Sequence, residues 1–280
     1  MSIVAIIGAG EIGAATAFAL ARRARVRDVR LLDAAASVAA GKALDMRQTG
    51  PIEGFDTAVS GRDDVLDAVN SDLIVIADAV TDGEWTGDRG LTLVRQLLRA
   101  GTTAPIVFAG PGQTWLMEAA VKELGVAPDR LAGTAASAIH SGARGLIGLE
   151  VAGSGVDVSV AVVGRAPTFT IGWTAGTVGG TPLSAEMPAH RMLAVSEMLK
   201  KLWPPKPHAI GAATALVVEG LLFGSRRHVC ATTVLDGEFG ERGRAAMLPL
   251  VLGHGRIQKR LDPSLSPQER VEFLNALSRG

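Results

Sequence analysis

A glycine-rich turn near the N-terminus constrains the fold of this chain more than any other feature. The turn, Gly8 to Gly13, reads GAGEIG and directly follows the apolar run Ile3–Ile7. It opens an alanine-rich segment, Ala14–Arg23, with few residues that resist helix formation. The pattern therefore predicts a buried strand, a tight turn and a helix in direct succession.

This order is typical of a dinucleotide-binding unit. One glycine permits the turn, one lets the backbone approach a pyrophosphate, and one lets helix and strand pack closely. The free N–H groups and the positive dipole end of the helix then face the phosphates. We expect the Glu11 side chain to point to solvent, since its charge would otherwise repel them. The predicted cofactor-binding residues of the turn are Gly8, Gly10, Glu11, Ile12 and Gly13.

Asp33 is the sixth predicted cofactor-binding residue. It ends a second apolar strand, Val29–Leu32, twenty positions after Gly13. A carboxylate at this place can accept hydrogen bonds from the adenosine ribose hydroxyls and repels the extra phosphate of NADP. The pattern thus predicts NAD as the cofactor. A glycine turn that is purely structural and binds no ligand is the alternative.

Composition excludes several classes of partner. The 280 residues include 28 Lys and Arg against 28 Asp and Glu, so no global field attracts nucleic acid or an acidic membrane. No segment approaches the ~18 apolar residues of a membrane span. The single cysteine, Cys230, lies in an apolar run and is expected to be a buried small side chain. No histidine has metal-ligand spacing. We expect a cytoplasmic protein without a metal.

The chain divides into two halves by pattern. β-type runs alternate with helical patterns such as Asp63–Val69 and Thr92–Ala100, which predicts an α/β, doubly wound parallel sheet. We place a dinucleotide-binding domain at residues 1–135 and a substrate-type α+β domain at 136–280. The first half has runs at Ile3–Ile7, Val29–Leu32, Thr57–Ser60, Leu73–Ala77 and Pro105–Ala109. The second has strands at Val156–Gly164, Thr168–Val178, His228–Leu235, Ala245–Leu252 and Arg256–Leu261, and helices at Glu186–Leu202, Ala209–Phe223 and from Ser266 to about Ser278.

Along nearly its whole length the chain resembles the malate/lactate dehydrogenase family. The matching segments include Gly41–Asp45 after the second strand, Pro51–Asp56, Ala212–Ala215 in a helix, and Val229–Gly240. The resemblance implies a Rossmann domain followed by an α+β substrate domain, NAD as cofactor and a homo-oligomer. It also implies reversible hydride transfer between the nicotinamide and a 2-hydroxy acid.

That reaction needs groups whose positions are substituted here. In the family a histidine paired to an aspartate exchanges the proton, and an arginine binds the substrate carboxylate. By resemblance, Ala166 stands at the place of the histidine, and Ile139 or His140 at that of the aspartate. Gly142 or Ala143 stands at that of the arginine. No catalytic residue can be assigned from these positions.

The segment that resembles the family's mobile loop, Asp78–Gly90, is acidic. It carries Asp82, Glu84 and Asp88 and is about two residues short, with Arg89 its only cation. Thr86 falls nearest the position of the arginine that polarises the carbonyl, and Gly110 replaces an asparagine that holds the substrate. Because acidic groups disfavour an anionic substrate, ordinary malate or lactate turnover is not expected.

Three hypotheses remain open. The first is an NAD(H)-binding family member without the usual 2-hydroxy-acid chemistry, which acts in binding, regulation or structure. The second is an active NAD-dependent oxidoreductase for a small carbonyl or hydroxy compound, with His140 and Arg144 sharing one helix face as a rebuilt site. The alternative is that these two residues form a local pair at the domain junction whose hydrogen bonds are satisfied within the chain. The third is a shell that binds nothing. Thr214 either lines the pocket or packs within its helix.

Overall fold

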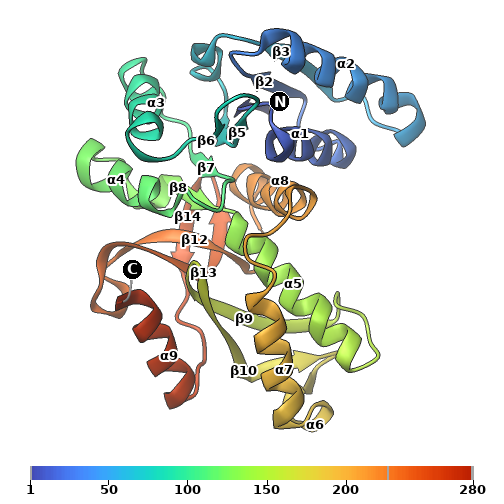
Figure 1. Cartoon of the computed structure of the whole chain (residues 1–280), viewed down its shortest axis with the longest axis vertical. Coiled ribbons are helices and arrows are strands. Elements are labelled where there is room, and N and C mark those ends of the chain that lie inside the picture. Colours follow the sequence, from blue (N-terminus) through green and yellow to red (C-terminus); the bar gives the residue numbers. More distant parts are fainter. Residues whose placement is uncertain (1, 226, 279–280) are drawn as a thin grey trace.

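The computed structural model describes residues 2–225 and 227–278. The molecule is elongated, with the elements of the first half at one end and those of the second half at the other (Figure 1). In the described part of the chain, hydrogen-bonded strands form one 12-stranded sheet and a separate two-stranded hairpin.

The first half is a parallel sheet in the order β3-β2-β1-β4-β7-β8. Alternate residues of the central strands fill separate cores on the two faces, since Val4 and Ile6 of β1 join one core and Ala5 and Ile7 join the other. This is the predicted doubly wound arrangement. The strands are β1 (Ile3–Ile7), β2 (Asp28–Leu32), β3 (Ala58–Arg62), β4 (Leu73–Ile76), β7 (Ile106–Phe108) and β8 (Leu131–Gly133).

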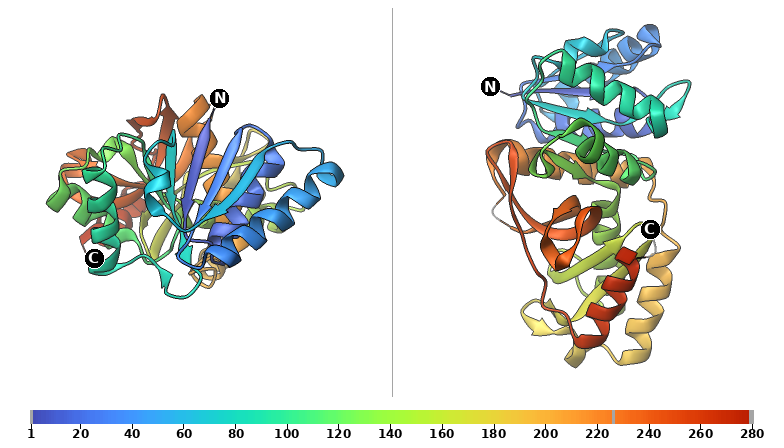
Figure 2. Two further views of the ribbon diagram at one scale, coloured as in Figure 1. Left: turned by 90° about the horizontal axis from the view of Figure 1, so that it is seen from above. Right: turned by 90° about the vertical axis from the view of Figure 1, so that its left-hand side faces the viewer.

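Helices cover both faces of this sheet, as the view from above shows (Figure 2). The segment Asp63–Val69, predicted as helical, forms only a short 3₁₀ turn at Val65–Ala68. A hairpin of β5 (Asp78–Ala79) and β6 (Gly83–Glu84) follows β4. The helices are α1 (Glu11–Arg23), α2 (Ala36–Glu53), α3 (Gly87–Arg99) and α4 (Thr114–Leu124). Helix α5 (Ala135–Glu150) follows β8 and packs in the core of the second half.

The second half is built on antiparallel strands, as expected. One residue pair, Thr232 with Gly133, joins its strands to the sheet of the first half. Another, Met247 with Gly164, joins the two groups of antiparallel strands within the second half. The strands are β9 (Val158–Arg165), β10 (Thr168–Val178), β11 (Thr181–Pro182), β12 (Val229–Asp236), β13 (Arg242–Gly253) and β14 (Arg256–Arg260). The helices are α6 (Leu183–Glu186), α7 (Ala189–Lys200), α8 (Pro207–Phe223) and α9 (Pro267–Ser278).

Helix α8 belongs to the second half in sequence but packs against α1 of the first. A Cβ at Gly211 would lie 2.6 Å from the backbone carbon of Ala15, so the two helices approach as closely as glycine allows. Glu219 of α8 is 3% exposed and is paired with Arg23 of α1. Within the described residues, none of the helices has the length and apolar character needed to cross a membrane.

Candidate functional site

The predicted glycine turn lies between β1 and α1. Gly8 has a φ of 108°, and its N–H donates to the carbonyl of Leu32 at 2.7 Å. A Cβ at Gly13 would overlap the carbonyl oxygen of Gly8, so these two positions require glycine. Ile12 is buried in the core beneath the turn, and the Glu11 side chain is exposed, as expected.

Asp33 is buried and fully engaged with the backbone around the turn. Its Oδ2 accepts hydrogen bonds from the N–H groups of Ala9 at 2.8 Å and Val80 at 3.0 Å. Its Oδ1 accepts from the N–H of Ala35 at 2.9 Å. The side chain therefore ties the glycine turn, the end of β2 and the segment after β4 together. Its binding of a ribose stays a prediction.

A second carboxylate, that of Asp78, occupies the start of α1. Its Oδ2 accepts from the Glu11 N–H at 2.9 Å and its Oδ1 from the Gly13 N–H at 2.9 Å. A Cβ at Gly10 would overlap this carboxylate. The amides that the pattern assigns to a pyrophosphate are thus already satisfied from within the chain, and as arranged here the turn does not fit that group.

Asp78 is not among the residues that the sequence predicts for this site. The available signal is its position, two residues after the end of β4 and at the same sheet edge as the turn, because β4 is a parallel neighbour of β1. The side chain of Lys42 holds the other side of the turn, where Nζ donates to the carbonyls of Ala9 at 2.7 Å and Gly10 at 3.2 Å.

Arg89, the one cation of the acidic segment Asp78–Gly90, binds the backbone of this loop. The guanidinium donates to the carbonyl of Asp82 at 3.1 Å and to that of Glu84 at 2.6 Å. It also lies over the ring of Trp85, with its central carbon 4.5 Å from the ring centre. Arg89 therefore binds its own loop.

Glu84 reaches from this loop to the segment after β7. Its Oε2 accepts from the N–H of Gly112 at 2.8 Å. Burial raises the pKa of Glu84, the Gly112 hydrogen bond opposes that rise, and the nearby charge of Asp78 adds to it. A Cβ at Gly110 would overlap the Glu84 carboxylate, so the acidic side chain fills the space beside this glycine.

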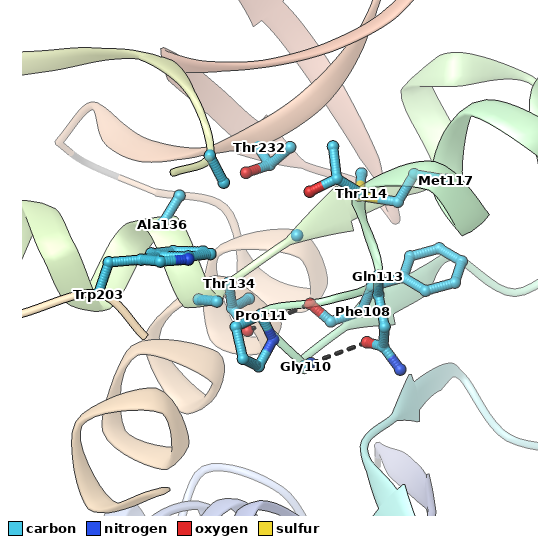
Figure 3. A pocket seen from close by; sticks show the side chains of 13 residues that line it. Phe108, Gly110, Pro111, Gln113, Thr114, Met117, Thr134, Ala136, Trp203 and Thr232 are labelled. Atoms are coloured by element: carbon cyan, nitrogen blue, oxygen red, sulfur yellow. Dashed lines mark hydrogen bonds between the residues drawn. The ribbon is translucent and has the colours of Figure 1, made fainter. Parts of the chain in front are cut away.

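A small pocket at the junction of the two halves is lined by Ala166 and Gly110, two of the positions that the resemblance predicts to be substituted (Figure 3). Its volume is about 10 Å³, which is room for one water molecule. Every lining side chain is uncharged. The lining residues are Phe108, Gly110, Pro111, Gln113, Thr114, Met117, Gly133, Thr134, Ala135, Ala136, Ala166, Trp203 and Thr232.

Other positions expected near the substrate are engaged elsewhere. Ile139 and Ala143 are fully buried in the core of the second half. Thr214 is also fully buried; its hydroxyl bonds to the carbonyl of Ile210 at 2.8 Å and to the hydroxyl of Thr134 at 2.7 Å. It touches the pocket only through Thr134.

His140 and Arg144 share one face of α5, as their spacing predicts, and this face lies against β9. The Nε2 of His140 lies 3.0 Å from the carbonyl of Val160. The Nε of Arg144 donates to the carbonyl of Val158 at 2.9 Å. Both residues line a second cavity of about 730 Å³, which shares no lining residue with the small pocket beside Ala166.

Burial controls the titratable groups of this second cavity. It lowers the pKa of His140 to about 4, so the imidazole is neutral at pH 7. It raises the pKa of Cys230 to about 11, consistent with the expected buried thiol. Over the described ranges, no cluster of three or more His, Cys, Asp or Glu side chains could hold a metal ion.

Comparison with known proteins identifies the first part of the chain. Residues 2–91 match the family model of the lactate/malate dehydrogenase NAD-binding domain. The malate dehydrogenase of Bacteroides fragilis is 29% identical over 295 aligned positions, which cover 98% of this chain and 94% of that protein. The malate dehydrogenase of Thermomicrobium roseum is also 29% identical, over 96% of this chain and 92% of its own length.

Solved structures extend the likeness over both halves. The malate dehydrogenase of Salinibacter ruber superposes with a TM-score of 0.89 at 26% identity, covering 99% of this chain and 94% of that one. A minor L-lactate dehydrogenase from Enterococcus mundtii shares the fold with a TM-score of 0.87 at 19% identity, over 99% and 96% of the two chains. Over both halves the chain is therefore similar to malate and lactate dehydrogenases, and residues 2–91 match the NAD-binding domain of that family.

Proposed function

We propose that this family member binds NAD(H) without carrying out 2-hydroxy-acid dehydrogenation, and acts as a binding, regulatory or structural protein. The uncharged junction pocket is the observation that carries the proposal. It is lined by Ala166, which by resemblance stands at the place of the family's histidine, and by no side chain that could exchange a proton near neutral pH.

The same pocket lacks the features needed to hold a 2-oxo acid. An anionic substrate requires a cation or several directed donors, and the lining offers no cation. Its 10 Å³ admits one water molecule but no three-carbon acid. Loss of one acid–base group costs on the order of 10²–10⁴ in rate. Losses within one catalytic unit do not multiply, so several missing acid–base groups need not slow the reaction more than one does. The missing carboxylate binding is a separate loss, because it lowers the affinity for the substrate.

The proposal includes the remaining expectations from the sequence. The cofactor would contact Gly8, Gly10, Glu11, Ile12, Gly13 and Asp33, with the domain boundary near residue 135. A homo-oligomer would cover exposed apolar side chains such as Leu44, Ile52 and Leu216. A cytoplasmic location fits the single buried cysteine.

An active oxidoreductase built on His140 and Arg144 is the second candidate, favoured by the 730 Å³ cavity that both residues line. It is the weaker one. The imidazole is bonded to a backbone carbonyl, and its lowered pKa keeps it neutral at pH 7, without the imidazolium proton that reduction of a carbonyl would need. Arg144 is bonded to two carbonyls of the segment that leads into β9.

Nucleotide titration followed by a turnover assay tests the proposal. NADH and NADPH are titrated by nicotinamide fluorescence, and NADH oxidation is then followed with a panel of 2-oxo acids and neutral carbonyls. We expect NADH binding in preference to NADPH and no oxidation. Oxidation of NADH by one compound would overturn the proposal. If His140→Ala then abolished that turnover while His190→Ala, at an exposed histidine, did not, the second candidate would be the correct one.

A further inference from the structure

The NAD-binding domain carries its own competitor for the cofactor. We propose that the Asp78 carboxylate occupies the pyrophosphate position at the start of α1, so that a dinucleotide binds only after this side chain has left. The inference rests on the NAD binding of the proposed function.

The contact reproduces the way a helix N-terminus binds an anion. Each oxygen of the carboxylate takes one amide of α1, those of Glu11 and Gly13, both at 2.9 Å. Charge-assisted bonds of this kind are stronger than neutral ones, and the helix dipole adds to them. The two donors cannot serve Asp78 and a phosphate oxygen at the same time.

Space leads to the same conclusion as hydrogen bonding. The turn is glycine-rich so that a ligand can approach its backbone, and Asp78 fills the room that these glycines leave. A Cβ at Gly10 would overlap its carboxylate. At Gly8 the contact is with the main-chain carbonyl of Asp78, which keeps its place when the side chain moves. The N–H of Gly10 also donates to the Asp78 carbonyl at 2.8 Å.

The backbone of Asp78 is held in place, and only its side chain needs to move. Asp78 pairs with Glu84 in the β5–β6 hairpin, and the next amide but one, that of Val80, is bonded to Asp33. The Asp78 side chain is partly exposed, and its bond to the Glu11 amide lies at the surface. A rotation of the side chain into solvent therefore frees both helix amides without unfolding the hairpin.

The charge of Asp78 would act even after such a rotation. A dinucleotide brings two phosphate charges to a turn already flanked by the carboxylates of Asp78 and Glu11. Lys42, bonded to the carbonyls of Ala9 and Gly10, is the cation placed against the turn. Removing the carboxylate should therefore help binding through both space and charge.

The test compares NADH affinity in three variants with that of the wild type. We expect Asp78→Ala to bind NADH about tenfold or more tightly than the wild type, and Asp78→Asn, which keeps the volume but loses the charge, to fall between them. Asp82→Ala is the matched control, since it removes the same charge from the same hairpin at a side chain that is 69% exposed. It should bind like the wild type.

Backbone amide signals give a readout that needs no nucleotide. In the wild type the Glu11 and Gly13 amides should resonate downfield and exchange slowly, and in Asp78→Ala they should move upfield and exchange faster. Water can hydrogen-bond to the Glu11 and Gly13 amides when the carboxylate is removed, so we expect Asp78→Ala to fold. If it does not fold, Asp78→Asn serves as the second variant.

The outcomes separate this inference from the proposed function. Equal or weaker NADH binding by Asp78→Ala would overturn the inference while wild-type binding kept the proposed function intact. Absence of NADH binding in all four proteins would overturn both. Tighter binding by Asp78→Ala together with oxidation of NADH by a 2-oxo acid would support the inference and overturn the proposed function.

Discussion

The guanidinium of Arg23 and the carboxylate of Glu219 form a two-pronged ion pair across 196 residues of sequence. Nε lies 2.6 Å from Oε1, and Nη2 lies 2.8 Å from Oε2. The Glu219 hydrogen bond raises the pKa of Arg23 above its ordinary value. Glu219 is buried, and its only other ion pair in the described residues is a longer one, to Arg25 at 3.4 Å.

Replacing Arg23 with Ala should therefore destabilise the protein. The change leaves a buried carboxylate with one distant partner, and the unfolding free energy should fall by about 1–3 kcal/mol in urea denaturation. Arg22→Ala on the same helix is the control, because Arg22 pairs with Glu53 in a largely exposed bridge. Its cost should stay below about 1 kcal/mol. Equal losses in the two variants would show that the buried pair has no special weight.

The close approach of α1 and α8 predicts opposite effects for two Gly→Ala substitutions. At Gly211 a Cβ would meet the Ala15 backbone at 2.6 Å, so overpacking should cost about 1–3 kcal/mol. At Gly145, an exposed position of α5 with no heavy atom within 4 Å of the added Cβ, the same change should stabilise by about 0.5–1 kcal/mol. Thermal melts of both variants measure the contrast, and a stabilised Gly211→Ala protein would contradict the packing.

Burial of His140 predicts a loss of stability in acid. Its pKa is about 4 in the folded protein against an ordinary 6.5, so the unfolded chain binds the proton more readily. The contribution is complete above pH 6.5 and declines toward pH 4, by at most about 1.4 kcal/mol per pH unit. The difference in unfolding free energy between wild type and His140→Gln should show this slope. An NMR titration of His140 near pH 6.5 would refute the expectation.

Glu84 predicts a slope of the opposite sign. Its raised pKa means that the folded protein retains the proton longer than the unfolded chain, so its contribution is present at low pH and is lost as pH rises above 4.5. Glu84→Gln keeps an acceptor for Gly112 without the charge. Relative to this variant, the wild type should lose stability between pH 4 and pH 7.

The strands of the first half could be predicted because each is a short apolar run buried on both faces, as in β1 and β4. Helix α2 could not. It contains Gly41 and Pro51, and the buried side of the helix is formed mostly by small residues. Large apolar side chains such as Leu44 and Ile52 are exposed, so the sequence shows no clear apolar stripe on one face. The segment around Val65 was expected to be helical from its composition, but its connection is too short for more than a 3₁₀ turn.

In the candidate site, too, some positions could be predicted from local sequence patterns and others could not. The positions of Gly8, Gly13 and Asp33 follow from their order around two strands, which local patterns encode. The carboxylate of Asp78 on the Gly13 amide depends on which side chain points into the turn after the sheet has formed, and no spacing rule contains that information. His140 and Arg144 illustrate both cases, because their shared face follows from their spacing, whereas its direction toward β9 does not.

The packing of α8 on α1 also has a consequence for the time at which the first half is completed. During synthesis at ~5–20 residues per second, Arg23 leaves the ribosome about 10–40 s before Glu219. Throughout that interval the surface of α1 at Ala15, later covered by Gly211, has no partner from its own chain. The face of α1 that packs on α8 in the folded protein therefore stays uncovered until α8 has been synthesised.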